Sequence, residues 1–355
     1  MRPEHGDSWP GESHIASSAR IGVSQPASPL TMELAAPMTD QANPSATYSW
    51  RVLLAFGCVY VFWGSTYTAI RVGTQLLPAF LLTGVRFLIS GTLMLAWCRF
   101  RGLRVFVAAK DMAWLALLGF LMLGIGNFAL VWSEKSLPSG LAALVVAVVP
   151  LYVAVLGLIL PGGERLRQRG WLGLLLGFSG LAVLLWPSMR EGGSSHSGQA
   201  AGGAVLLLGS LAWAGGSMLS RRLKLPVHVL VAAGWEMLVA GIVNASLATA
   251  DREWPHAHWT HAAFGSIAYL VTFGSLVGFT AYIWLLEHIP VPKVATYAYV
   301  NPVVAVILGA LILGERLSAT EYIGMVAVVI AVGLVTSSQL QAGKPAVELE
   351  CAPVE

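Results

Sequence analysis

From Leu137 to Leu166 the chain reads LPSGLAALVVAVVPLYVAVLGLILPGGERL, and from Ile289 to Leu317 it reads IPVPKVATYAYVNPVVAVILGALILGERL. Both stretches begin with an aliphatic residue and a proline, continue as a mainly apolar run, and end in Gly-Glu-Arg-Leu. Each run is long enough for a helix that crosses a bilayer, which needs roughly 20 apolar residues. The shared order of features predicts a membrane protein built from two related halves.

The similarity extends beyond these stretches, at two nearly constant distances along the chain. The matched pairs are Pro150 with Pro302 and Trp132 with Trp284, each 152 residues apart, and Trp63 with Trp213 and Arg71 with Arg221, each 150 residues apart. We therefore expect a first repeat at residues 51–188 and a second at residues 200–338, flanked by tails at 1–50 and 339–355.

The composition of the chain requires an apolar solvent besides its own core. Hydrophobic residues make up 56% of the 355 residues, charged residues only 11%, and the mean hydropathy is +0.70. A soluble chain of this length cannot bury so much apolar surface. The predicted spans are Val52–Ile70, Ala79–Trp97, Met112–Trp132, Gly140–Leu160, Gly170–Pro187, Gly202–Ser220, Val229–Ala248, Ala262–Leu286, Val294–Leu313 and Tyr322–Ser337. Continuously apolar runs are typical of helices and not of membrane β-barrels, so we predict an all-α membrane protein of ten transmembrane helices.

Each half holds five predicted spans, and this odd number decides how the halves are related. The second half must enter the membrane from the side opposite to the first, so the repeat is inverted. Inverted repeats around a central site are a recurring design of secondary transporters, because the symmetry supplies two states that open to opposite sides. The architecture therefore favours alternating access.

Basic residues predict the orientation of the spans, because Lys and Arg of short loops collect on the cytoplasmic side. Eleven lie in or beside the second, fourth, sixth and eighth loops, against five in the other loops. Both termini are therefore expected in the cytoplasm. Residues 1–50 are rich in Pro, Ser, Ala and Gly without an apolar core of signal-peptide length. We expect a disordered tail there and a native start at Met32 or Met38.

Several short motifs, taken in order, resemble those of the EamA-type drug/metabolite transporters, and most of all the bacterial YedA-like branch. The motifs are Trp63-Gly64-Ser65-Thr66-Tyr67, Gly84-Val85-Arg86-Phe87, Pro138-Ser139-Gly140, Tyr297-Ala298-Tyr299-Val300-Asn301-Pro302 and Gly314-Glu315. The resemblance covers residues 50 to 338. It implies ten helices in two inverted five-helix repeats, a place in the bacterial inner (plasma) membrane, and export of amino acids, related metabolites or drugs.

Two charged residues fall well inside predicted spans, where a charge costs at least about 2.5–3.5 kcal/mol, so each should face the bundle interior or water. Arg86 could bind a substrate carboxylate or act in gating; alternatively it is a structural anchor or snorkels outward. Glu236 could couple transport to protons or contact a cation; alternatively it is a buried structural acid. The two positions align in the repeat, but a direct salt bridge between them would be strained.

The central prolines Pro150 and Pro302 each remove a backbone donor and free a carbonyl group four residues earlier. In lipid such a group needs a partner from protein or cavity water. We expect kinks that line a central cavity and take part in gating, with packing kinks as the alternative. Besides Arg86, the predicted substrate-binding residues are Trp63, Ser65, Thr66, Asn127, Trp213, Tyr282, Tyr297, Tyr299 and Asn301. Each of these could instead serve helix packing.

Glu164 and Glu315 occupy the repeated Gly-Glu-Arg-Leu at the membrane faces. A tight turn between helices is favoured, because Ser318 and Glu321 have the spacing of a capping box that opens the last helix. A hinge or gate is the alternative.

Other function classes fit less well. An intramembrane enzyme would need clustered acids, yet the four aspartates lie outside the spans, and no phosphate-binding Gly-x-x-x-x-Gly-Lys-Ser/Thr loop is present. No basic stripe points to nucleic acid. We expect a transporter with no catalytic residue, metal or other cofactor, in contact with lipid, a small-molecule substrate and, through Glu236, protons, as a monomer or weak homodimer. An intramembrane enzyme or a channel for small amphipathic molecules is the alternative.

Overall fold

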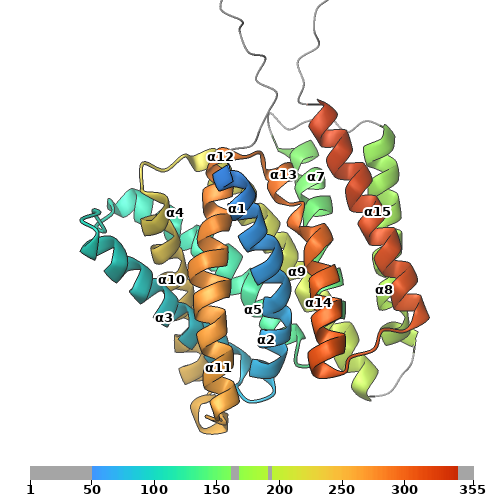
Figure 1. Cartoon of the computed structure of the whole chain (residues 1–355), viewed down its shortest axis with the longest axis horizontal. Coiled ribbons are helices and arrows are strands. Elements are labelled where there is room, and N and C mark those ends of the chain that lie inside the picture. The colour runs from blue at the N-terminus through green and yellow to red at the C-terminus, as the bar shows by residue number, and fades with distance from the viewer. Residues whose placement is uncertain (1–49, 161–167, 191–193, 343–355) are drawn as a thin grey trace, which may run out of the picture. The chain divides into compact units, whose positions relative to one another are not determined.

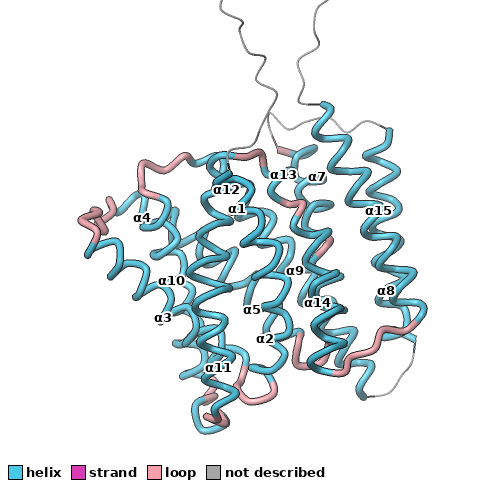
Figure 2. The backbone as a smooth tube through the Cα atoms, viewed as in Figure 1, coloured by secondary structure: helices cyan, strands magenta, loops and turns pink. Residues whose placement is uncertain are grey.

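The computed structural model describes residues 50–160, 168–190 and 194–342, and all regular structure in these ranges is helical (Figure 2). Ten helical segments in this part of the chain are long and apolar enough to cross a membrane, which confirms the ten predicted spans. The predicted tails at 1–50 and 339–355 lie almost wholly outside the described residues, and Glu164 lies outside them as well.

The described residues of the first half form five spans from ten helical elements. They are α1 (Trp50–Cys58), η1 (Val59–Trp63), α2 (Gly64–Thr74), α3 (Ala79–Phe100), α4 (Ala109–Gly119), η2 (Phe120–Asn127), α5 (Phe128–Ser133), α6 (Ser139–Val146), α7 (Val149–Ile159) and α8 (Gln168–Arg190).

The second half again provides five spans. Its elements are α9 (Ser194–Leu223), α10 (Val229–Ala250), the short η3 (Trp254–His256), α11 (His261–Tyr269), η4 (Leu270–Phe279), α12 (Thr280–His288), α13 (Val291–Val294), α14 (Tyr297–Leu313) and α15 (Ala319–Ala342). Because five spans precede α9, the second half crosses in the opposite sense, and the repeat is inverted.

Three spans contain a π-helical segment in their middle. The segments η1, η2 and η4 interrupt the first, third and eighth spans, and the chain continues on both sides as α-helix. The wider π turn is rare and recurs at functional sites. The third and eighth spans are equivalent in the repeat, so this distortion belongs to both halves.

The fourth and ninth spans are broken in two, but their prolines sit differently. In the fourth span α6 ends at Val146, whose carbonyl cannot pair with Pro150, and α7 restarts at Val149 with the proline in its first turn. In the ninth span the break falls at Ala295 and Thr296, and Pro302 lies inside α14. The predicted helix break therefore lies directly before Pro150 in the first half, but well before Pro302 in the second half.

The halves are joined by helix pairs that take one member from each. Helix α3 packs along α10, and α8 packs along α15, at opposite sides of the bundle in Figure 1. At the first pair a Cβ on Gly84 would lie 2.6 Å from the Ala245 nitrogen, and one on Gly241 would lie 2.4 Å from the Leu88 nitrogen. Glycine is required there because the two backbones touch.

The spans end at two faces, which we name after residues at the ends of the first span. The Trp50 face is where α1 begins, and the Thr74 face is where α2 ends. The connections at the Trp50 face include residues 101–108, 224–228 and 289–290, and those at the Thr74 face include residues 75–78, 134–138, 251–260 and 314–318.

Candidate substrate site

A cavity of about 60 Å³ lies among spans of both halves. It would hold roughly four water molecules, since each needs about 10–15 Å³ of such space. Of the predicted substrate residues, the cavity is lined by Trp63, Thr66, Arg86, Asn127, Trp213, Tyr297 and Asn301. Most of the remaining wall is apolar, with Phe87, Leu123 and Phe279 among its side chains. The site therefore combines an apolar chamber with a few polar groups.

Among the described residues that line the cavity, Arg86 on α3 is the one cation, and it is only 3% exposed. Its Nε donates to the Ser275 hydroxyl at 2.9 Å, and Nη1 donates to the Asn127 side-chain oxygen at 3.3 Å. A side chain at position 274 would clash with the Arg86 guanidinium, because a Cβ on Gly274 would lie 2.7 Å from Nη2. Among the described residues, no acidic side chain forms an ion pair with Arg86, so its charge is held only by neutral partners.

Trp63 lies at the centre of an aromatic cluster that forms one wall of the cavity. Its ring is 5.5 Å from Trp213, its partner in the repeat, edge-to-face at 80°, and 5.3 Å from Tyr297 at 89°. Its indole N–H donates to the Gly274 carbonyl at 3.0 Å, within the π-helical η4. Such edge-to-face pairs add about 0.5–1.5 kcal/mol each beyond area burial. The cluster thus fixes a rigid apolar wall.

Three predicted substrate residues are not among those that line the cavity. Tyr282 is 2% exposed; its hydroxyl pairs with Ser217 at 2.6 Å and accepts from the Trp213 indole at 3.1 Å. Ser65 pairs with the Tyr269 hydroxyl at 2.6 Å, and Tyr299 donates to Thr336 at 2.8 Å. The polar groups of these three side chains are therefore used within the protein, to join helices or to hold a wall residue.

Asn301 and Thr66 line the cavity with much of their polar capacity already used inside the protein. With the Asn301 amide nitrogen facing the two acceptors beside it, it donates to the carbonyls of Tyr60 and Tyr297 at 3.1 and 3.3 Å. The Thr66 hydroxyl donates to the Trp63 carbonyl at 2.7 Å. Arg86 is therefore the strongest group left for a polar ligand.

Glu236 on α10 lines a different pocket, of about 570 Å³, which opens among the α9, α10 and α12 ends at the Trp50 face. The pocket is also lined by Arg221, Lys224, His228 and Glu287. Glu236 is 1% exposed, and its Oε2 has no hydrogen-bond partner in the described structure. It forms no ion pair with Arg86 in the described part of the chain. The two intramembrane charges therefore serve separate pockets.

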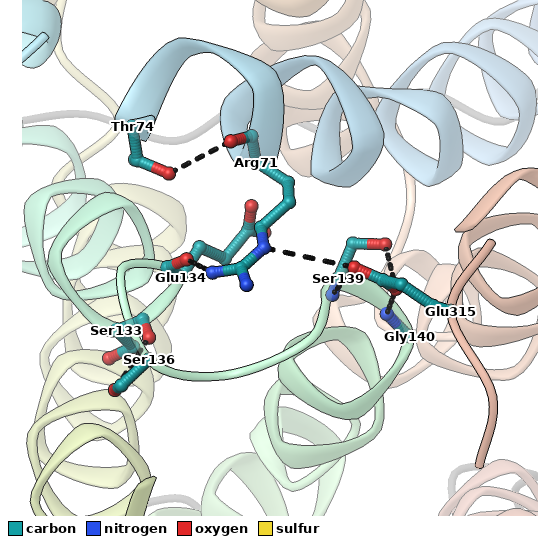
Figure 3. A network of polar contacts seen from close by, with 8 residues as sticks. All are labelled: Arg71, Thr74, Ser133, Glu134, Ser136, Ser139, Gly140 and Glu315. Carbon is teal, nitrogen blue, oxygen red and sulfur yellow. Dashed lines mark hydrogen bonds and ion pairs between the residues drawn. The ribbon is translucent and has the colours of Figure 1, made fainter. Parts of the chain in front are cut away.

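Glu315 ties the second half to the first at the Thr74 face (Figure 3). Its carboxylate accepts from the Ser139 N–H at 3.0 Å, the Ser139 hydroxyl at 2.7 Å and the Gly140 N–H at 3.4 Å. It also lies 3.8 Å from Nε of Arg71. An acid at a helix N-terminus satisfies free N–H groups and the helix dipole. Glu315 thus caps α6 from the other half, while the Ser318–Glu321 capping box opens α15 as predicted.

A second glutamate makes the same kind of link at this face. Glu253, between α10 and α11, accepts from the Leu81 N–H at 2.7 Å at the start of α3. Burial raises the pKa of the Glu253 carboxyl, although hydrogen bonds from Leu81 and Phe80 and the charge of Lys135 lower it. Two loops of the second half therefore cap helices of the first half at the Thr74 face.

Sequence reasoning missed Glu134, which lies between these links and follows α5. Arg71 donates to its backbone carbonyl, and Figure 3 shows the Arg71 guanidinium between Glu134 and Glu315. The repeat offered a signal, because Arg71 matches Arg221, but Glu134, the acid beside Arg71, lies two residues beyond the predicted span Met112–Trp132. In the part of the chain that the structure describes, no three His, Cys, Asp or Glu side chains converge as a metal site.

The model of the EamA-like transporter family matches the chain twice, at residues 49–186 and 200–337, with five spans in each match. The chain belongs to this family. The EamA resemblance drawn from the motifs is confirmed. YedA of Escherichia coli strain K12, described as an uncharacterized inner membrane transporter, is 37% identical over 283 residues, 79% of this chain and 89% of that protein.

Two further similarities bear on function and fold. A probable amino-acid metabolite efflux pump of Salmonella typhimurium strain LT2 is 26% identical over 298 residues, 78% of this EamA chain and 91% of that protein. A crystal structure at 23% identity covers 82% of this chain and 99% of its own with a TM-score of 0.61, which shows the fold alone. The family and relatives indicate a transporter rather than an enzyme, and the ten spans indicate a multi-pass inner-membrane protein.

Proposed function

We propose that this EamA protein is a secondary exporter of small metabolites that carry a carboxylate, with amino acids as the first candidates, and that it works by alternating access. The observation that carries the proposal is Arg86, a buried cation on the cavity wall whose partners are neutral. A substrate carboxylate would supply the missing charge, and hydrogen bonds between ionised partners are the strong ones. The amino-acid efflux pump among the relatives supports this substrate class.

The size of the cavity supports a mechanism in which the halves move. A volume of about 60 Å³ suits only the smallest amino acids. Larger substrates therefore require the walls around Trp63 and Arg86 to separate. The inverted repeat gives two related ways to do this, one toward each face. With the orientation predicted from basic residues, the Trp50 face and the Glu236 pocket would lie on the cytoplasmic side.

Counterflow in proteoliposomes tests the proposed export. Vesicles loaded with an unlabelled amino acid should take up the labelled compound saturably and above its equilibrium level. Conductance that does not saturate would instead support a channel, and chemical conversion of the compound would support an enzyme.

Matched ligand pairs test the role of the carboxylate. An amino acid should raise the apparent melting temperature, because ligand binding to the folded state stabilises it. The corresponding amino-acid amide keeps the size and amine but lacks the anion, and it should give little shift. Equal shifts from both members of the pair would reject the carboxylate contact.

Proton coupling through Glu236 stays a prediction, supported by its burial and the unpartnered Oε2 in a pocket at the Trp50 face. We expect Glu236→Gln to weaken the dependence of transport on pH while leaving ligand-induced stabilisation intact. Transport rates of wild type and variant over a pH series provide the measurement. Unchanged transport with an unchanged pH profile would exclude this role.

A further inference from the structure

Glu134 is a buried acid whose carboxyl group makes no hydrogen bond in the described structure. Its side chain is fully buried, and neither carboxyl oxygen has a hydrogen-bond partner within the described structure. Buried polar groups are nearly always hydrogen-bonded, and an ionised carboxylate without donors is strongly disfavoured. The surroundings of this carboxyl therefore suit its protonated form, and burial raises the pKa of Glu134 well above its ordinary value.

The charged groups near Glu134 come from both halves. Arg71 on α2 is the nearest cation and lowers the pKa of Glu134, whereas Glu315 from the second half raises it. The Tyr67 phenol, also on α2, lies close enough to interact electrostatically.

Among their described residues, the other helices packed against α5 place no charged side chain closer to Glu134 than Arg71 and Glu315. Helix α9 presents backbone carbonyls of Gly202 and Gly198 to Ser133 and Ser136. On α3 the nearest charge is Arg86, whose guanidinium binds Asn127, seven residues before Glu134 in the chain. Lys135, next in the chain, is exposed and interacts with Glu253. Arg71 is therefore the cation that an ionised Glu134 would recruit.

The Arg71 guanidinium thus lies between the carboxyl groups of Glu134 and Glu315. Glu315 has other donors, whereas Glu134 has none in the described structure. Glu315 already accepts from three donors at the start of α6, as suits an ionised carboxylate, and Arg71 adds the opposite charge. If Glu134 loses its proton, the buried charge has no donor unless Arg71 turns to it from the carbonyl it now binds. That turn would withdraw Arg71 from Glu315, one of the two glutamates that link the halves at this face.

We propose that Glu134 is a proton-binding site that latches the Thr74 face: with the proton bound, Arg71 stays with Glu315 and the face is closed, and with the proton lost, Arg71 moves to Glu134 and the face opens. The proposal rests on the alternating access of the proposed function. It assigns this face a proton site of its own, separate from Glu236 at the Trp50 face.

Spin-label distances across the Thr74 face test the latch in the full-length protein in lipid nanodiscs. Labels replace Gln75 in the first half and Ala319 in the second, both exposed, after the three native cysteines are changed to alanine. In the otherwise wild-type protein a short distance should dominate at acidic pH, and a longer one should grow as the pH rises. Glu134→Gln, which stays neutral, should keep the short distance throughout.

Two further variants keep the test specific. Glu134→Asp retains a titratable carboxyl and should regain the response to pH. Glu253→Gln changes another glutamate of the same face and should respond like the wild type. The proposal is overturned if the wild type shows no response, if Glu134→Gln responds like the wild type, or if Glu253→Gln abolishes the response equally. The experiment needs no substrate, so failed counterflow with an intact response would reject the proposed export alone.

Discussion

The two faces of the bundle use equivalent arginines in different ways. At the Thr74 face Arg71 binds the carbonyl of Glu134 and lies 3.8 Å from Glu315 of the other half. At the Trp50 face its repeat partner Arg221 donates to the carbonyls of Leu286 and Glu287 at 2.7 and 2.9 Å, all within the second half.

The difference shows which part of the design follows from duplication. The arginine and the carbonyl at the end of the neighbouring span occur at both faces, because Glu134 and Leu286 are 152 residues apart, the offset of the repeat. Among the described residues, Arg71 but not Arg221 lies beside a carboxylate of the other half, and Leu286 has no carboxyl group where Glu134 has one. Arg221 instead lines a pocket of about 570 Å³. We infer that the common contact shapes each half and that Glu134 and Glu315 control closure of the Thr74 face.

The largest effect is expected at Arg86, which lines the cavity to which both faces would give access. Arg86→Met removes the charge from the cavity and should weaken carboxylate binding about 10- to 100-fold, the equivalent of losing roughly 1.5–3 kcal/mol of charge-assisted hydrogen bonding. The ligand dependence of the melting temperature measures this. Ser275→Ala removes one partner of Arg86 but keeps the cation, and it should cost much less. Wild-type affinity in Arg86→Met would remove the basis of the proposed site.

Glu315 should have the next largest effect, and Glu321 supplies a matched control. Both cap a helix N-terminus, Glu315 across the halves and Glu321 within its own turn. Glu315→Ala should favour the open Thr74 face by about 1–2 kcal/mol, a factor of roughly 5–30 in population. Glu321→Ala should lose a cap of similar energy without changing the Gln75–Ala319 distance. Equal shifts from both variants would mean that capping alone is measured.

Substitution of Arg71 should have a smaller effect on the Thr74 face, and substitution of its repeat equivalent Arg221 should have none. Arg71 and Glu315 are partly exposed, at 25% and 14%, so their ion pair contributes at most about 1 kcal/mol. Arg71→Met should therefore open the Thr74 face by up to about fivefold in population, whereas Arg221→Met should lower stability without opening that face. The same label pair gives the measurement, and identical responses would show that the faces do not differ as described.

The smallest effect is expected in the pH dependence of stability. Burial raises the pKa of Glu134 well above 4.5, although Arg71 lowers it and Glu315 raises it. The folded state therefore binds this proton more tightly than the unfolded state, so the stabilisation is present below pH 4.5 and is lost as the pH rises through the folded-state pKa. Glu134→Gln stays neutral and lacks this decline. Its melting temperature should exceed that of the wild type by a margin that grows with pH; a constant margin would contradict the assignment.

The sequence predicts the spans and the inverted repeat because both depend on local length and composition. Runs such as Gly140–Leu160 are too apolar for any place but a membrane core, and five spans per half leave one relative sense for the halves. The order of Trp63, Arg86 and Asn301 among the family motifs also points to residues that line the cavity.

The rest depends on contacts that no local pattern specifies. Ser139 begins α6 without an acid in its first turn, and the cap comes from Glu315, 176 residues later. Pro302 marks a broken span, yet the break lies at Ala295 and Thr296. The sequence places Tyr282 beside the cavity, but Ser217 and Trp213 hold its hydroxyl, and it is not among the residues that line the cavity. The cap depends on packing between the halves, and the position of Tyr282 depends on packing within the second half.

Distances measured at both faces in the same samples test alternating access between the two halves. The Gln75–Ala319 pair reports on the Thr74 face, and labels at the exposed Lys110 in α4 and His288 in α12 report on the pocket at the Trp50 face. Across a pH series, with and without a bound carboxylate ligand, we expect one distance to lengthen as the other shortens. Distances that lengthen together, or that do not change under any of these conditions, would contradict alternating access between the two halves.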